Sequence, residues 1–158
     1  MSFDRVKTYF ENLGMIDRVK EFDESSATVE LAAKAIGCEP ELIAKTMSFQ
    51  LGDEAILIVT AGDAKVDNRK YKDHFHKKAK FIPAESLESM IGFPPGGVCP
   101  FAVKDDIRIF LDESLKRFDI VYPAAGSGNS AVKLSLEELE KYSNSEAWVD
   151  VCKGWQIE

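Results

Sequence analysis

The chain has 158 residues, of which 45% are hydrophobic and 30% charged, so it can form both an apolar core and a solvated surface. This length suits one ordinary domain, and we expect a single domain over residues 1–158. No apolar run approaches the roughly 20 residues of a membrane-spanning helix, and the amino terminus lacks the apolar stretch of a signal peptide. We therefore expect a cytoplasmic protein with no membrane partner. The net charge of −7 argues against non-specific coating of nucleic acid.

The first part of the chain predicts mostly helices. Apolar residues recur with helical spacing over residues 3–13, and Gly14 ends the pattern. A short strand is predicted at 18–22. The hydroxyls in Ser25-Ser26-Ala27-Thr28 are candidate caps for a helix predicted at 29–36, which Gly37 ends. A short helix is predicted from Pro40 to about Lys45.

The character then changes to strands and short helices. Two extended runs, 46–51 and 55–60, flank Gly52-Asp53 and predict a hairpin. Further strands are predicted at 80–82, 107–111, 119–122, 131–134 and 148–151. Helices are predicted at 67–77 and 85–91, as a turn at 112–118, and from Ser135, whose spacing to Glu138 is that of a capping box. The pattern indicates a mixed α/β fold.

The segment 92–100, Gly-Phe-Pro-Pro-Gly-Gly-Val-Cys-Pro, is too rich in glycine and proline for regular structure. The adjacent Gly96 and Gly97 let a ligand approach the main chain closely, and successive amides there can converge on an oxyanion. The alternative is a rigid connector without a chemical role. Cys99 within it is a candidate nucleophile, but no neighbouring base is indicated by the sequence.

Two sets of basic residues are candidates for contacts with phosphate. Lys45 lies among apolar and small residues where a helix is expected to meet a strand, and it could anchor a phosphate or carboxyl group. Segment 65–80 carries seven Lys/Arg and two Asp on an otherwise acidic chain. In both cases the alternative is a solvated surface.

Other patterns carry less weight. Residues 126–131 match the dinucleotide-binding pattern G-x-G-x-x-A, but the alternation in 131–134 predicts a strand where that motif needs a helix. The three cysteines are widely spaced and form no C-x-x-C pair, so neither a disulfide framework nor a zinc site is expected. His74 and His76 are two residues apart and would face different sides of a helix.

Several segments, in their order along the chain, resemble one known family. They are Thr28–Ala33, Ile43–Thr46, Ala61–Asp67, Gly96–Pro100 and Gly126–Gly128. The chain from about residue 20 to 150 resembles the YbaK/EbsC family, which is related to the editing insertion domain of bacterial prolyl-tRNA synthetases. The resemblance implies a curved, partly barrel-like mixed sheet flanked by helices, with no metal or organic cofactor.

The resemblance also implies a function, the hydrolysis in trans of tRNA that carries the wrong amino acid, typically a proline tRNA bearing alanine or cysteine. The expected partners are the aminoacylated acceptor end of a tRNA and a prolyl-tRNA synthetase. Cys99 stands where relatives often have Ser, and Ala131 stands where some cysteine-editing members have an acidic residue. These two departures leave the choice of amino acid open.

The implied residue roles fall into three sets. The expected catalytic set is Lys45, which would hold the terminal nucleotide, with Gly96, Gly97 and Val98, whose amides would stabilise the oxyanion. The expected substrate-binding set is Thr46, Cys99, Pro100, Gly126, Ser127, Gly128 and Asn129. The expected tRNA contacts are Lys65, Arg69 and Lys70.

Two other functions stay open at this level. The same fold could bind an aminoacyl group, a nucleotide or tRNA without turnover, because fold does not determine function. A nucleotide-dependent oxidoreductase would follow from the G-x-G-x-x-A match only if a helix began inside that motif.

Overall fold

A computed structural model describes residues 2–155; residues 1 and 156–158 of the expected domain lie outside the described part. The helices are α1 (Ser2–Asn12), α2 (Val29–Ile36), α3 (Asn68–Phe75), α4 (Leu87–Met90) and α5 (Leu136–Tyr142). The strands are β1 (Val19–Glu21), β2 (Ile43–Leu51), β3 (Glu54–Ala61), β4 (Lys65–Val66), β5 (Arg108–Asp112), β6 (Ile120–Pro123), β7 (Ser130–Val132), β8 (Leu134–Ser135), β9 (Ala147–Val149) and β10 (Cys152–Lys153).

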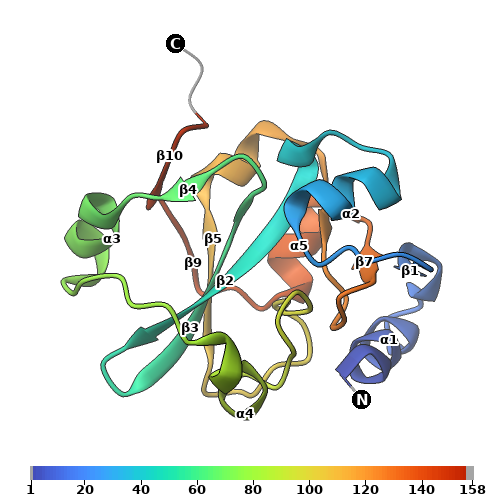
Figure 1. Cartoon of the computed structure of the whole chain (residues 1–158), viewed down its shortest axis with the longest axis horizontal. Coiled ribbons are helices and arrows are strands. Elements are labelled where there is room, and N and C mark those ends of the chain that lie inside the picture. The colour runs from blue at the N-terminus through green and yellow to red at the C-terminus, as the bar shows by residue number, and fades with distance from the viewer. Residues whose placement is uncertain (1, 156–158) are drawn as a thin grey trace.

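The main sheet has six strands in the order β8-β6-β2-β3-β5-β9. The strands β2 and β3 form an antiparallel hairpin, whereas β6 pairs with β2, and β5 with β3, in parallel. Two smaller pairs, β1 with β7 and β4 with β10, extend the structure at its margins. Figure 1 shows the strands curling around one another with helices beside them. The expected mixed α/β fold with a curved, partly barrel-like sheet is confirmed.

Both faces of the sheet are covered, which explains why β3 is an almost continuous apolar run. Ile56 and Ile58 point into a cluster with Tyr71 of α3. Leu57 and Val59 point into a larger cluster on the opposite face. The helices α1, α4 and α5 contribute to that larger cluster, so α3 lies on the other side of the sheet from them. A third, smaller cluster lies between α2 and the start of β2.

The predicted helix starts are confirmed in three places. Thr28 accepts a hydrogen bond from the amide of Leu31 and caps α2, and Ser135 forms a complete capping box with Glu138 at the start of α5. Asp67 caps α3 by accepting hydrogen bonds from the amides of Arg69 and Lys70. No helix within residues 2–155 is long and apolar enough to cross a membrane.

Several predicted boundaries were wrong. The helix expected from Pro40 to Lys45 is a single 3-10 turn over Pro40–Leu42, and β2 already begins at Ile43. Pairing with β3 along eight residue pairs outweighs the weak local preference for helix in this segment. The strand expected at 131–134 is divided at Lys133 into β7, which pairs with β1, and β8, which pairs with β6; the amide of Lys133 donates to the carbonyl of Arg18, in register with the β1–β7 pair. Residues 80–82 form only one isolated bridge, between Phe81 and Phe49.

Candidate active site

A cavity of about 410 Å³ opens between α2, the outer edge of β2 and the loop after α4. This volume lies within the range of pockets that hold small molecules. Apolar side chains make up most of the wall, and Lys45 is the charged residue among them. The wall is built from segments 26–32, 43–48, 81–87, 95–98 and 122–131.

The cavity lies where the outer edge of β2 has no neighbouring strand. The parallel partner β6 pairs only with Ile43 and Ala44. Further along, the amide of Gln50 donates to Lys80 and the carbonyl of Ser48 accepts from Ile82, so the even-numbered residues of β2 direct their main-chain groups outward. Thr46 lies between the pairing with β6 at Ala44 and the contact at Ser48, and it follows the same alternation. Its amide and carbonyl therefore face the cavity, and no backbone partner meets them there within residues 2–155.

Lys45 is the third residue of β2, half-buried and part of the cavity wall, and not at a helix–strand junction as expected. Within residues 2–155 its ammonium makes neither a hydrogen bond nor an ion pair with another side chain. Burial is the main cause that lowers its pKa below that of an ordinary lysine, while Asp63 and Glu30 act in the opposite direction. The cavity therefore contains a desolvated cation that is available to an anionic or ester oxygen.

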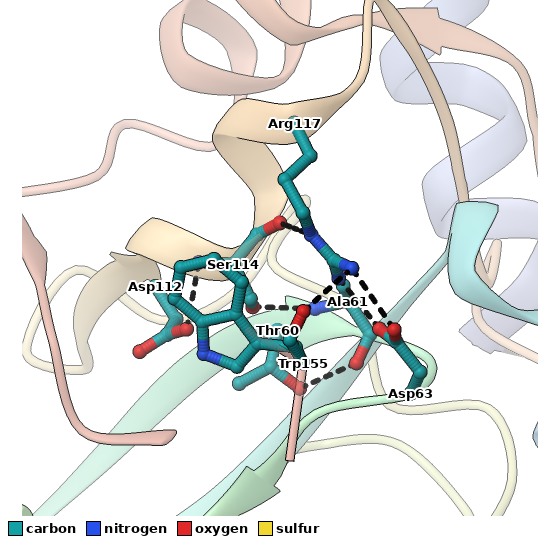
Figure 2. Close-up of polar contacts among 7 residues, drawn as sticks. All are labelled: Thr60, Ala61, Asp63, Asp112, Ser114, Arg117 and Trp155. Carbon is teal, nitrogen blue, oxygen red and sulfur yellow. Dashed lines mark hydrogen bonds and ion pairs between the residues drawn. The ribbon is translucent and has the colours of Figure 1, made fainter. Parts of the chain in front are cut away.

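Asp63, the carboxylate with the largest effect on the pKa of Lys45, forms an ion pair with Arg117. Figure 2 shows the guanidinium of Arg117 turned toward Asp63, with Nη2–Oδ1 and Nη1–Oδ2 distances of 2.6 and 2.9 Å. Arg117 also donates to the carbonyls of Ser114 and Trp155. This bidentate contact lowers the pKa of Asp63, so its carboxylate stays ionised and stays bound to Arg117 rather than closing onto Lys45.

A second set of contacts in Figure 2 holds the end of β3, where Thr60 pairs with Lys45. The amide of Ala61 donates to the hydroxyl of Ser114 at 3.1 Å. The carboxylate of Asp112, which is 0% exposed, accepts from the amides of Ser114 and Val151, each at 2.9 Å. Because each of these polar groups is buried and has a hydrogen-bond partner, the end of β3 next to Lys45 is held in place.

The glycines of the loop 94–98 allow close packing, as expected from their sequence. Gly96 has a φ of +83°, and a Cβ there would lie 2.7 Å from that of Ala27. A Cβ at Gly97 would lie 2.8 Å from the main chain of Ser127. Only glycine therefore lets this loop approach both neighbours and form one wall of the cavity.

The structure separates the three amides expected to form an oxyanion site. The amide of Gly97 donates to the carbonyl of Pro94 at 3.0 Å, and Gly97 does not line the cavity. In this conformation Gly97 is not available as the expected oxyanion donor. Gly96 and Val98 do line the cavity, and within residues 2–155 their amides have no protein acceptor.

The turn 126–129, expected to bind substrate, does not line the cavity but supports its wall. The carbonyl of Gly128 accepts from the amide of Ser26 at 2.7 Å, and Asn129 exchanges hydrogen bonds with Phe22 through its carbonyl and its side-chain amide. Ser127 donates within the turn to Asn129 at 2.9 Å. Since strand β7 and not a helix follows, the G-x-G-x-x-A match does not form a dinucleotide site, and the oxidoreductase interpretation is wrong.

Cys99 and Pro100 were also expected to contact substrate, but both are buried and neither lines the cavity. Burial raises the pKa of the Cys99 thiol to about 12, and the nearest polar contact of its sulfur is the carbonyl of Phe101. A buried thiol that stays protonated is a poor nucleophile, and in this structure Cys99 lies outside the cavity wall. Its role in the structure is packing.

Two residues of the cavity wall carry buried hydroxyls without a hydrogen-bond partner within the described residues, and one of the two was not predicted. Thr46 was expected, and its Oγ1 is buried and unpaired within the described residues. Ser26, which is 7% exposed, was noticed only as a candidate helix cap, yet its Oγ is also unpaired. Buried hydroxyls usually find a partner, so these two unpaired groups are unusual features of the wall. Sequence spacing offers no signal for Ser26, because the contact depends on the turn at Gly128.

Of the three residues expected to contact tRNA, two are exposed and one is held by other groups of the protein. Lys65 and Arg69 are exposed. Lys70 is held by Asp150 at 3.1 Å and by the carbonyl of Cys152 at 3.0 Å. The helix α3 that carries Arg69 and Lys70 packs in the cluster on the face opposite α1, α4 and α5.

Comparison with known proteins gives a consistent family. Residues 23–142 match the aminoacyl-tRNA editing domain. The chain is 47% identical over 157 residues to an uncharacterized Bacillus subtilis protein, YwhH, covering 99% of this chain and 100% of that protein. It is 23% identical over 128 residues to EbsC of Enterococcus faecalis, named as a candidate Cys-tRNA(Pro)/Cys-tRNA(Cys) deacylase, covering 79% of this chain and 77% of EbsC.

The chain is also similar to part of a synthetase and to a solved structure. The proline–tRNA ligase of Bacillus licheniformis is 30% identical over 138 residues, which cover 84% of this chain and 24% of the ligase. A solved structure described as a candidate trans-editing enzyme for prolyl-tRNA synthetase superposes with a TM-score of 0.85 at 26% identity, covering 97% of this chain and 98% of that one. The resemblance inferred from the sequence motifs is confirmed, and the chain belongs to the aminoacyl-tRNA editing domain family.

Proposed function

We propose that this protein is a trans-editing deacylase that hydrolyses the ester of a mischarged tRNA, specifically a proline tRNA bearing a small non-cognate amino acid. The observation that carries the proposal is the cavity whose wall combines the unpaired Lys45, the main-chain edge of β2 at Thr46 and the loop 95–98. Family membership, and relatives named for editing on proline tRNA, support this substrate class.

In this mechanism Lys45 holds a phosphate or ribose oxygen of the terminal nucleotide. Its lowered solvation strengthens this contact, because a buried cation gains more from an oxygen ligand than one in water. The ester carbonyl then lies against the loop, where the free amides of Gly96 and Val98 stabilise the oxyanion that forms when water attacks. The proton of the water passes to the leaving ribose oxygen, and the products are the free amino acid and deacylated tRNA.

No dedicated acid–base triad is needed for this reaction, because the aminoacyl ester is already activated and the neighbouring ribose hydroxyl can assist the water. The buried Cys99 thiol plays no part in it. Selection among amino acids then depends on the size and shape of the cavity, whose wall includes Ser26 and Thr46. A methylene that does not fit is worth about 1–3 kcal/mol in such a pocket, so discrimination by size is moderate.

The direct test replaces Lys45 with alanine and measures deacylation of proline tRNA charged with alanine, cysteine or proline. A charge-assisted hydrogen bond contributes about 1.5–3 kcal/mol, so Lys45→Ala should lower kcat/KM about 10- to 100-fold. Lys104→Ala, which removes an exposed lysine outside the cavity, is the matched control and should leave kcat/KM unchanged.

Undiminished deacylation by Lys45→Ala would remove Lys45 from the mechanism. Binding of tRNA by the wild-type protein without hydrolysis of any charged form would instead indicate a non-catalytic binding module. Circular dichroism of each variant shows whether the fold is retained, and Lys45→Arg shows whether the charge alone is sufficient.

A further inference from the structure

We propose that Phe81 is a stacking platform for a nucleobase of a single-stranded 3′ end, placed at the mouth of the cavity. The inference rests on the proposed function, because it names how the nucleic acid beyond the ester is held. It assigns a binding role to a residue that the sequence motifs did not single out.

Phe81 is unusually exposed for a large apolar side chain. It is 56% exposed, more than any other large hydrophobic residue recorded as exposed within the described part of the chain. A single exposed apolar residue needs no explanation by itself, but Phe81 also forms part of the cavity wall. Its ring is therefore accessible to solvent and to a ligand that enters the cavity.

The ring is also held in place before any ligand arrives. Hydrogen bonds from Gln50 to Lys80, at 2.8 Å, and from Ile82 to Ser48, at 3.0 Å, fasten the main chain on both sides of Phe81 to β2. The ring packs against that of Phe49 with a centroid distance of 4.6 Å and an interplanar angle of 34°. Phe49 is fully buried and packs in turn against Tyr71. A platform with this support loses little conformational entropy when a base stacks on it.

The position of Phe81 matches the path that the nucleic acid must take. Phe81 lies opposite Phe49, four residues along β2 from Lys45, a separation of about 13 Å at the usual rise of a strand. Both residues line the same cavity, and the unpaired edge at Thr46 lies between them. An ester bound beside Lys45 and the loop therefore leaves the Phe81 end of the cavity for the adjoining nucleotides.

The charge around Phe81 favours a polyanion over an apolar protein segment. Lys77, Lys78 and Lys80 precede it directly, and all three are exposed. Single-stranded nucleic acids are recognised by this combination of aromatic rings that stack on bases and basic residues that neutralise the backbone. The carboxyl-terminal end of the basic segment 65–80 therefore lies at the mouth of the cavity.

The test measures binding of an uncharged RNA hairpin with an unpaired 3′-CCA end by fluorescence anisotropy. The same hairpin is also prepared with an abasic nucleotide at each of the three terminal positions in turn. Loss of one stacked base weakens binding about 10-fold, so we expect Phe81→Ala to weaken binding of the intact hairpin by that factor. Phe81→Trp should bind within about 2-fold of the wild type, because a larger ring still stacks. Leu13→Ala, which removes a different exposed apolar side chain, is the matched control.

At one abasic position, Phe81→Ala and the wild type should bind equally, which identifies the stacked base. The inference is overturned if Phe81→Ala binds the intact hairpin as the wild type does, if the wild type does not prefer the intact hairpin to any abasic one, or if Phe81→Ala weakens every hairpin equally. With charged tRNA, Phe81→Ala should raise KM and change kcat little. Absence of deacylation by the wild type, together with Phe81-dependent binding, would refute the proposed function and leave this inference standing.

Discussion

The contact between the loop 94–98 and the turn 126–129 offers a sharp test of how the cavity wall is held. A methyl group added at Gly97 would lie 2.8 Å from the Cα and the amide nitrogen of Ser127, and 2.9 Å from the carbonyl carbon of Gly126. Ordinary carbon contacts begin near 3.4 Å, so the loop must retreat by about 0.6 Å. All three contacted atoms belong to the main chain and cannot rotate away.

Overpacking of this kind costs about 1–3 kcal/mol, which for a chain of this size lowers Tm by about 2–12 °C. The displaced loop also carries the amides proposed to stabilise the oxyanion, and a shift near 1 Å costs up to about 100-fold in rate, so we expect Gly97→Ala to lower kcat at least about 10-fold. Gly128→Ala is the matched control, because its methyl group would lie 3.6 Å from the Cβ of Ala27, an ordinary contact, and its φ is not positive.

Thermal unfolding and deacylation of mischarged tRNA are measured for both variants. If Gly97→Ala unfolds at the same temperature as Gly128→Ala and deacylates at the same rate, the close approach of loop and turn does not hold the cavity wall.

Two further predictions concern titration and the buried thiol. Lys45 should lose its proton at a pH below 10.5, the pKa of an ordinary lysine. Between the pKa of Lys45 in the folded protein and that in the unfolded chain, the unfolded chain binds more protons, so the contribution of Lys45 to the free energy of unfolding should rise with pH. Over the same pH range the contact of Lys45 with substrate phosphate should weaken. NMR of methylated lysines, assigned with Lys45→Met, measures this, and a midpoint at or above 10.5 would contradict it. Cys99→Ala should deacylate within about 2-fold of the wild type, because the thiol has a pKa near 12 and lies outside the cavity; a loss comparable to that of Lys45→Ala would restore Cys99 to the site.

Local chemistry was sufficient to predict much of the fold. The caps at Thr28 and Ser135 and the glycine at Gly37 depend on residues within one turn of each other, so they are visible in the sequence. The hairpin around Gly52 depends on a short turn between two apolar runs and was also predicted. The short strands β4 and β10 were missed because each has two residues and is defined only by pairing with the other.

The sequence also indicated the family, through the order of soft motifs, and it pointed to Lys45, Thr46 and the Gly96–Val98 loop. Which of these groups face one cavity was decided by tertiary structure alone. The amide of Gly97 is occupied by Pro94, and Cys99 lies in the core, because loop geometry and burial depend on partners far away in sequence. Ser26 enters the cavity because a turn about 100 residues away holds it there, and the opening exists because β6 leaves β2 after Ala44. Periodicity reports which face of a strand is apolar, but not where its edge lacks a neighbour, and that missing neighbour is what forms the proposed site.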